Sequence, residues 1–454
     1  MADKISAFDE HLAKIGKLRR ATDDALELIR REGGPAGRDN RRIREFLEAR
    51  STGPKQGTDE WLMWRSRSVG GSDLSSLMGM NPYRDRKALL NDKVQSQMFA
   101  VTGGKPPWGF KAPCEWGKMF EPLITRFIEI NCMTTVLGTE ACIPTGRQHH
   151  NSPDGYASLM YRMERRSGAP GDFVTRLVTE DDPSPTWHGT IIASIECKCP
   201  YKRKPKGVLP SLYLPQVLSA IGVSPVVDAG LFVDAVFRRC SLAQLGSSRF
   251  YSHHRERSTW GSAVAWGIMD VYRSAGAAGG KRAFGDSTGD KRGDSAGDER
   301  GDSAGECEDS ARAASDPLAV LGLETTSATI PGLADLGAAS FEQFEAFLEL
   351  LFSGEVEVRY REPATAAQLG AAYSEDDAGA DLIAQIGGDP ADRRDVHNLI
   401  GIIPWKLLEV CYVPQPPAPD FLEEEVYPRI EPFFREVAET RQRIEEILET
   451  NTSA

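Results

Sequence analysis

No hydrophobic run in this chain of 454 residues approaches the roughly 20 residues that a membrane-spanning helix requires. The first residues, Met1 to Lys4, are polar and do not form the apolar core of a secretory signal peptide. The eight cysteines lack the regular spacing of a disulfide framework, which indicates reduced thiols. We therefore expect an intracellular protein, in the cytoplasm or the nucleus, that is not secreted.

An excess of positive charge is also missing, since the formal net charge is −12, and this argues superficially against a nucleic-acid partner. The charges are unevenly distributed, however. Residues 420–449 contain ten acidic and four basic residues, whereas residues 198–206 contain five basic residues and no acidic one. An enzyme acting on nucleic acid needs only a locally basic path, so the net charge does not exclude one.

A hydrophobic content of 40% is sufficient for a sizeable core, and the length allows two or three domains. Three consecutive eight-residue Gly-Asp units begin at residue 285 and contain almost no hydrophobic residues, which predicts a disordered linker. We divide the chain into a helical N-terminal extension (1–55), a core (56–274), the Gly-Asp-rich linker (275–316), an insertion of unknown role (317–396) and a C-terminal strand and helix that complete the core (397–454).

The hydrophobic periodicity predicts a mixed α/β order. Helices are expected over 115–131, 211–222 and 420–449, and strands over 153–159, 190–199, 226–238 and 401–413. The roughly 30 residues between the first two strands are expected to form a surface insertion. Because a proline is tolerated in the first turn of a helix or at a kink, Pro122 predicts that Glu121 lies at a helix start.

The residues that indicate chemistry are Ser152-Pro153-Asp154-Gly155 and, about forty residues later, Ile195-Glu196-Cys197-Lys198. Alternate residues of a strand share a face, so Glu196 and Lys198 point the same way. If a neighbouring strand brings Asp154 alongside, two carboxylates and one ammonium surround a single point. Such a site suits Mg²⁺-assisted hydrolysis of phosphodiesters.

Simpler explanations exist for each of these residues. Pro-Asp-Gly is also a turn signature, Glu196 and Lys198 also fit an exposed strand pair, and Glu121 also fits a solvated carboxylate at a helix end. We interpret His149-His150 and His253-His254 as surface histidines because neither pair has a helical partner or a cysteine at zinc spacing.

Four blocks of sequence make the functional interpretation of these residues specific. They are WLMWRSRSVGGSD (61–73), GKMFEP (117–122), SPDG (152–155), and IECKCP with YLPQ (195–200 and 213–216). In this order they resemble the YqaJ family of viral recombinases and lambda exonuclease, within the PD-(D/E)XK nuclease superfamily. The resemblance covers residues 56 to about 240 and, more faintly, 398–445. It implies an α/β, restriction-endonuclease-like core with a central mixed β-sheet flanked by helices.

The resemblance implies a metal site made by Asp154, Glu196 and the main-chain carbonyl of Cys197, with Glu121 as a further ligand directly or through water. The expected cofactor is one or two Mg²⁺ ions, for which Mn²⁺ can substitute. Lys198 would position the attacking water or help to deprotonate it. Some related nucleases hold an iron–sulfur cluster with three late cysteines, but only Cys411 lies late here, so no cluster is expected.

In similar exonucleases an arginine and a serine seven residues later bind the terminal 5′-phosphate, and Arg65 and Ser72 have that spacing. Guanidinium binds phosphate in a bidentate manner, and a serine at a helix N-terminus adds a hydroxyl beside main-chain amides. Arg67, in the same block, is a further candidate for contact with this phosphate. The alternative is an N-cap serine and an unrelated surface arginine.

Tyr213 and Gln216 match the Tyr-x-x-Gln helix of the family, where the glutamine supports the site or contacts DNA. Leu218 departs from the pattern, because many relatives place a second glutamine there. A basic loop either follows the phosphate backbone or is merely solvated, and it contains Lys202, Arg203, Lys204 and Lys206. The opposite face of the strand carries Cys197 and Cys199, which we expect to pack into the core.

From the resemblance we expect a Mg²⁺-dependent exonuclease that degrades linear duplex ends in the 5′-to-3′ direction, in viral or phage-type recombination. Double-stranded DNA ends, a single-strand annealing protein and further copies of the chain in a trimer are the expected partners. The first alternative is a structure-specific or nicking endonuclease of the same superfamily. The second is a non-catalytic DNA-binding protein that retains the fold.

Overall fold

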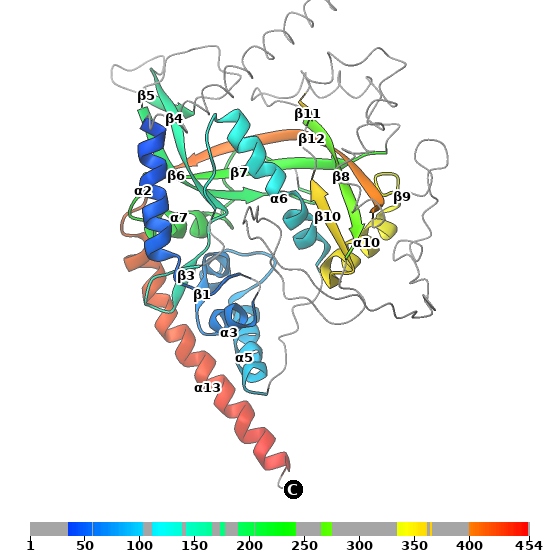
Figure 1. Cartoon of the computed structure of the whole chain (residues 1–454). Coiled ribbons are helices and arrows are strands. Elements are labelled where there is room, and N and C mark those ends of the chain that lie inside the picture. The colour runs from blue at the N-terminus through cyan, green and yellow to red at the C-terminus, as the bar shows by residue number, and fades with distance from the viewer. Residues whose placement is uncertain are drawn as a thin grey trace, which may run out of the picture.

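A mixed β-sheet with helices on both faces forms the body of the protein, as the computed structural model shows (Figure 1). The structure describes residues 35–56, 58–102, 111–138, 142–165, 173–177, 189–203, 205–241, 265–274, 334–360, 364–365 and 399–452. The predicted linker, the first 34 residues and His253-His254 lie outside the described residues. The expected architecture, a central mixed sheet flanked by helices, is confirmed.

The main sheet has the strand order β10-β8-β12-β7-β6-β4-β5. Its strands are β4 (Gly155–Arg165), β5 (Phe173–Leu177), β6 (Gly189–Lys198), β7 (Ala229–Arg239), β8 (Ala265–Arg273), β10 (Val356–Tyr360) and β12 (Leu399–Gln415). Two short strands, β9 (Ala334–Asp335) and β11 (Ala364–Thr365), pair with β12 and β8. Strands β6 and β7 run parallel, whereas β6 is antiparallel to β4, and β12 is antiparallel to β7.

The four predicted strands are therefore present, with shifted ends. The expectation of a plain surface insertion between β4 and β6 is wrong in part, because β5 lies within it and pairs with β4. The C-terminal strand returns to the core, since β12 lies between β7 and β8 in the sheet.

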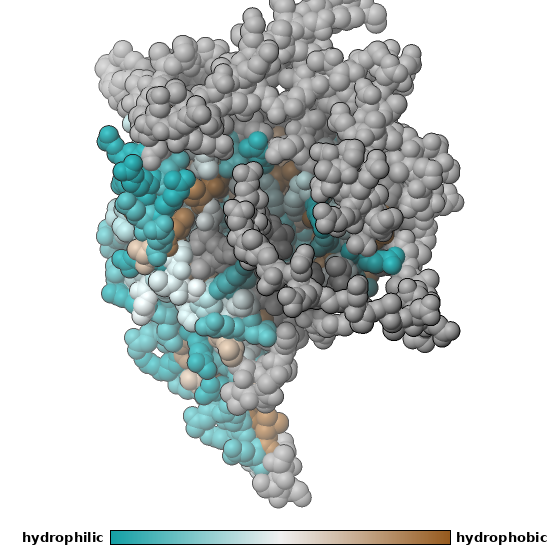
Figure 2. Space-filling view, in the orientation of Figure 1, coloured by the Kyte–Doolittle hydropathy of each residue, from teal (hydrophilic) through white to brown (hydrophobic). Residues whose placement is uncertain are grey.

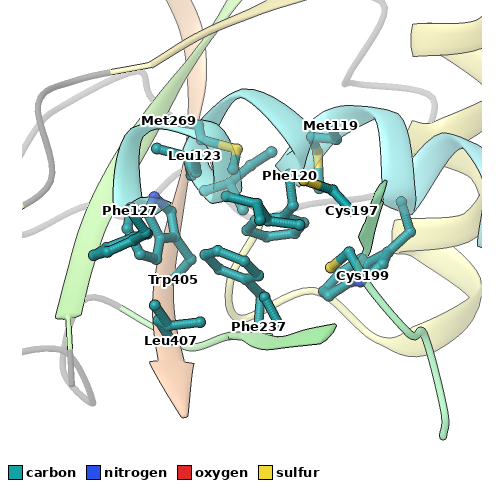
Figure 3. Close-up of a cluster of buried hydrophobic side chains, with 14 of the residues drawn as sticks. Met119, Phe120, Leu123, Phe127, Cys197, Cys199, Phe237, Met269, Trp405 and Leu407 are labelled. Atoms are coloured by element: carbon teal, nitrogen blue, oxygen red, sulfur yellow. The ribbon is translucent and has the colours of Figure 1, made fainter. Parts of the chain in front are cut away.

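One face of the sheet is covered by α6 (Ala112–Asn131) and α10 (Phe341–Ser353), which share the largest apolar cluster with alternate residues of the strands. Figure 3 shows the aromatic centre of this cluster, where Phe120 of α6 lies against Phe237 and Trp405 from the sheet. Because α10 comes from the insertion at 317–396, that segment contributes to the core.

The other face is covered by α7 (Leu214–Gly222) and by α2 (Pro35–Arg50) from the N-terminal extension. On α2, Ile43 and Phe46 pack in one cluster with Tyr156 of β4. Asp39 of α2 accepts hydrogen bonds from the hydroxyls of Ser158, on β4, and Thr190, on β6, at 2.9 and 2.7 Å. The extension therefore braces the two strands that lead to the predicted site.

Helix α6 begins earlier than the sequence indicated. It starts at Ala112, and Pro122 lies inside it, so the prediction that Glu121 lies at a helix start is wrong. Trp116, Met119 and Phe120 precede the proline and are all buried in the main cluster. Their burial extends the helix backward past Pro122, although the proline removes one main-chain hydrogen bond.

A smaller unit lies at one end of the sheet. It contains α3 (Asp59–Ser66), β1 (Val69–Gly70), a 3₁₀ turn (Gly71–Asp73), α4 (Leu74–Leu77), α5 (Arg86–Thr102), β2 (Ile143–Pro144), β3 (His149–Asn151), a π-helical turn (Phe421–Val426) and α13 (Tyr427–Thr452). Strand β3 pairs with β1 and β2, and the helices bury a second apolar cluster. The predicted C-terminal helix is confirmed, preceded by the π turn.

Toward its C-terminal end α13 extends beyond the body, and Figure 2 shows apolar surface there. Ile447 and Leu448 are exposed on this part of the helix. None of the helices in the described segments is both long enough and apolar enough to cross a membrane.

Candidate active site

Asp154 lies directly before β4, and the backbone of β6 holds it in place. The main-chain N–H of Asp154 donates to the carbonyl of Ile195 at 3.0 Å. Its Oδ2 atom accepts the main-chain N–H of Cys197 at 2.6 Å. Both contacts join the SPDG segment to the Glu-x-Lys strand, so the two sequence motifs meet.

Glu196 and Lys198 share a face of β6, and the Lys198 ammonium pairs with Oε1 of Glu196. Glu196 is 2% exposed, and its second oxygen, Oε2, is buried without a hydrogen-bond partner among the described residues. A buried carboxylate oxygen without a partner is costly, unless a cation or a donor arrives from outside the chain.

Burial raises the pKa of all three carboxyls of the site. Burial raises the pKa of Glu121 to about 7, and the charge of Asp154 adds to the shift. Burial raises the pKa of Glu196 to about 8, although Lys198 acts in the opposite direction. The pKa of Asp154 is raised by burial, while Lys198 and the Cys197 N–H oppose the rise. We call Glu121, Asp154 and Glu196 the acidic cluster.

Lys198 is held in its charged form. Burial lowers the pKa of Lys198, but Glu196 and Asp154 outweigh burial and raise it above the ordinary lysine value. Cys197 and Cys199 alternate with these residues along β6 and belong to the main apolar cluster. Burial raises the pKa of both thiols, which keeps them protonated.

The carboxylate oxygens of the acidic cluster have the charge and the chemical type that a hard divalent cation binds. Carboxylate oxygens are the ligands that Mg²⁺ prefers, and the partnerless Oε2 of Glu196 is a free acceptor. Among the described residues, however, no three His, Cys, Asp or Glu side chains are arranged so that they could hold a metal ion as they stand. Two of the oxygens face other donors here, since Lys198 takes one oxygen of Glu196 and Cys197 takes one of Asp154.

Arg65 lies on α3, and its guanidinium is 3.8 Å from Oδ1 of the buried Asp73. Arg84 pairs with the same oxygen at 2.9 Å, and Lys93 pairs with Oδ2 at 2.8 Å. Lys93 also donates to the carbonyls of Arg65 and Ser68, both at 2.8 Å. The sequence analysis missed this Asp73 cluster, defined as Asp73, Arg65, Arg84 and Lys93.

Three cations surround the carboxylate of Asp73, and Arg84 also pairs with Asp92 at 2.6 Å, so the cluster and Asp92 together keep an excess of one positive charge. Burial acts to raise the pKa of Asp73, but Lys93, Arg65 and Arg84 together hold it well below the usual range. Ser72 is exposed next to Asp73 in the 3₁₀ turn that leads into α4. Arg67 is exposed at the end of α3. Arg65 and Ser72 are thus linked through Asp73, in a locally positive region.

The interpretation of His149 and His150 as surface histidines is wrong, since they are 1% and 4% exposed. Nε2 of His149 lies 3.0 Å from the Ser219 hydroxyl, and Nδ1 of His150 lies 3.0 Å from the Ser68 hydroxyl. Burial lowers the pKa of His149 to about 4 and contributes most to lowering that of His150 to about 2. The two neutral rings therefore pack the smaller sheet against α3 and α7.

Asn151 extends the same connection toward the acidic cluster. Its side-chain amide donates to the Ser219 hydroxyl at 2.9 Å and to the main-chain carbonyl of Gln216 at 3.2 Å. Since Asn151 lies three residues before Asp154, it ties the SPDG segment to the first turn of α7. Gln216 thus lies in the first turn of α7, and its main-chain carbonyl makes this contact.

Tyr213 precedes α7, and its ring stacks on Phe232 with the centroids 5.5 Å apart. The Lys198 ammonium lies 5.3 Å from the Tyr213 ring centroid, so Tyr213 borders the predicted site. Lys202 is exposed over the rings of Tyr201 and Phe341, whereas Lys204 lies outside the described residues.

An aspartate before one strand and a Glu-x-Lys on its neighbour, in a mixed sheet flanked by helices, is the arrangement that the sequence resemblance to PD-(D/E)XK nucleases implies. Residues 60–226 match the family model described as the YqaJ-like viral recombinase domain. The resemblance drawn from the four sequence blocks is thereby confirmed.

Two curated relatives are counterparts of one another from African swine fever virus. The protein of the Badajoz strain is 31% identical over 230 residues, which covers 50% of this chain and 63% of that protein. The protein of a South African tick isolate is 33% identical over 224 residues, covering 48% and 60%. The matched region thus spans less than two thirds of the length of these relatives. Among solved structures, an alkaline exonuclease from Laribacter hongkongensis is 19% identical, with a TM-score of 0.25, over 39% of this chain and 74% of its own.

Proposed function

We propose that the protein is a deoxyribonuclease that hydrolyses phosphodiesters of linear duplex DNA from its 5′ ends and acts in viral recombination. The observation that carries this proposal is the acidic cluster, three carboxyls with raised pKa values beside the charged Lys198. The match to the YqaJ-like viral recombinase family agrees with a nuclease that acts in recombination.

Glu121, Asp154 and Glu196 would hold Mg²⁺ together with the main-chain carbonyl of Cys197, and Mn²⁺ would substitute. The bound cation would supply charge neutralisation at the scissile phosphate. The partnerless Oε2 of Glu196 and the mutual repulsion of the carboxyls both favour a cation from outside the chain.

Lys198 would act as a positioning cation for the attacking water. Its raised pKa disfavours the neutral form that a general base requires, so proton removal by Lys198 is the less favoured of its two expected roles. The Tyr213 ring on one side and the Glu196 carboxylate on the other limit where its ammonium can lie.

Arg65 and Ser72 would bind the terminal 5′-phosphate, with Arg67 at the edge. The excess of positive charge in the Asp73 cluster favours an anion here, and a guanidinium binds phosphate with two parallel hydrogen bonds. Gln216 and Tyr213 would line the path between this pocket and the acidic cluster, and Lys202 and Lys204 would follow the phosphate backbone. A trimer and an annealing partner remain part of the proposal by family resemblance.

One assay tests the proposal. The purified chain is incubated with Mg²⁺ and either circular duplex or linear duplex carrying 5′-phosphate or 5′-hydroxyl ends. We expect degradation of linear DNA with a strong preference for 5′-phosphate, and its loss in Asp154→Ala and Glu196→Ala. Efficient nicking of circles would favour an endonuclease, and tight binding in Ca²⁺ without cleavage in Mg²⁺ or Mn²⁺ would favour a non-catalytic DNA-binding protein.

A further inference from the structure

Besides Glu196 and Asp154, a third carboxylate lies on the strand next to Lys198. Strands β6 and β7 are parallel, and Lys198 is the register partner of Asp234. Neighbouring strands lie about 4.8 Å apart, and register partners project from the same face. Asp234 is 2% exposed and therefore cannot satisfy its charge with water.

Arg203 satisfies Asp234 instead. Arg203 lies in the loop after β6, and its guanidinium binds the Asp234 carboxylate in a bidentate manner. Nη1 donates to Oδ2 at 2.5 Å, and Nη2 donates to Oδ1 at 2.8 Å. On the far side of Asp234, its register partner in β12 is Cys411, which carries no positive charge. The pair is thus a buried carboxylate held by a guanidinium that is itself 28% exposed.

Tyr213 lies near both cations. Its ring centroid is 5.3 Å from the Lys198 ammonium and 6.0 Å from the Arg203 guanidinium. The ring stacks on Phe232, so the pair Arg203–Asp234 and the pair Lys198–Glu196 border the same aromatic side chain. Both Glu196 and Asp234 therefore have a cation of their own.

We propose that Arg203 is a positioning residue, which by occupying Asp234 keeps the ammonium of Lys198 directed at Glu196 and the acidic cluster. Without Arg203, the bare Asp234 carboxylate would be a buried anion within reach of the flexible lysine side chain, on the same face of the sheet. Lys198 would then be drawn to Asp234 as well as to Glu196, because both carboxylates are buried and an unpaired buried charge is costly. The inference rests on the proposed function of Lys198.

The alternative role for Arg203, as one of the basic loop residues that follow the phosphate backbone, predicts different kinetics. A phosphate contact contributes to affinity and to its salt dependence. A positioning residue acts on the chemical step, where misplacement of a reacting group costs roughly 10- to 100-fold in rate. The separation of kcat from KM therefore distinguishes the two roles.

The test compares Arg203→Gln, Asp234→Asn and the double variant of the full chain, on linear 5′-phosphorylated duplex with Mg²⁺. We expect Arg203→Gln to lower kcat by roughly 10- to 100-fold with little change in KM. Asp234→Asn has a smaller effect, because Lys198 keeps Glu196. The double variant recovers most of the wild-type kcat, since replacing both members of a buried ion pair leaves no bare charge.

Lys202→Gln is the matched control, because it removes a positive charge from the neighbouring position of the same loop without exposing Asp234. It is expected to raise KM and weaken the salt dependence. If Arg203→Gln behaves like Lys202→Gln, or if adding Asp234→Asn does not restore kcat, the positioning role is wrong and Arg203 contacts DNA.

A crystal structure of Arg203→Gln decides the same point without activity. We expect the Lys198 ammonium to lie within hydrogen-bond distance of Asp234, and an ammonium that stays on Glu196 overturns the inference. Absence of cleavage by the wild-type chain would instead overturn the proposed function, so the two failures are distinguishable.

Discussion

The main-chain N–H of Cys197 donates a hydrogen bond to Oδ2 of Asp154 at 2.6 Å, across the junction of β4 and β6. A main-chain donor cannot be removed by a change of side chain, so the orientation of this carboxylate depends on the pairing of the two strands. The catalytic aspartate of the proposed site is thereby positioned by the sheet itself.

We expect Asp154→Asn to abolish cleavage and preserve the fold. The amide oxygen can still accept the Cys197 N–H, whereas one negative charge of the acidic cluster is lost. Loss of electrostatic stabilisation at a reacting centre costs roughly 100-fold or more in kcat. Cleavage of linear duplex measures this loss, and the melting temperature in EDTA provides the control. That temperature should not fall, because the neutral amide does not repel Glu121 and Glu196; a variant with wild-type kcat would contradict the assignment.

The acidic cluster also predicts how a divalent cation alters stability with pH. The pKa values of Glu121 and Glu196 are raised from an ordinary 4.5 to about 7 and about 8. A raised pKa means that the protonated carboxyl stabilises the fold. That contribution is fully present below pH 4.5 and is lost as the pH rises through 7 to 8.

Mg²⁺ requires the ionised carboxylates, so it should raise the melting temperature more at pH 8.5 than at pH 6. Thermal denaturation with Mg²⁺ or EDTA at the two pH values measures the difference. In Glu196→Gln the difference should shrink, since one of the two titrating carboxyls is gone. An equal Mg²⁺ effect at both pH values would show that the cation binds elsewhere.

How far the site is predictable from sequence depends on the range of the contacts. That Glu196 and Lys198 share a face is predictable, because the two-residue period of a strand is a local rule. That Asp154 lies beside them is not a local rule, because it depends on the pairing of β4 with β6. The position of Glu121 inside α6 is not predictable from the local proline rule either, because burial of the residues before Pro122 overrides it.

The ion pairs of the site are even harder to predict from the sequence. The Asp73–Lys93 and Asp234–Arg203 pairs join residues 20 and 31 positions apart, on elements whose packing and register no local pattern specifies. For the same reason the burial of His149 and His150 was unpredictable, since it depends on β3 lying between β1, β2 and α7.

The end-recognition pocket is tested by Arg65→Gln. Loss of a charged hydrogen-bond donor to the terminal phosphate should lower kcat/KM on 5′-phosphorylated duplex by roughly 10- to 100-fold. Activity on 5′-hydroxyl ends should change far less, so the preference for phosphate disappears. Ser72→Ala should give a smaller loss of the same kind, because it removes a neutral hydroxyl. An unchanged preference in both variants would show that the 5′-phosphate binds elsewhere.

The Asp73 cluster makes a separate prediction about stability. Asp73 is 1% exposed and holds the buried Lys93 and the partly exposed Arg84. In Asp73→Asn, Lys93 keeps only main-chain carbonyls as charge-compensating partners, and removing one partner of a buried ion pair costs about 3–5 kcal/mol. Urea denaturation should therefore show a much lower free energy of unfolding. Arg84→Gln is the control, with a smaller loss, because Arg84 is 24% exposed and water replaces it. Equal effects of the two variants would show that the buried Lys93–Asp73 pair stabilises the fold no more than the Arg84–Asp73 pair does.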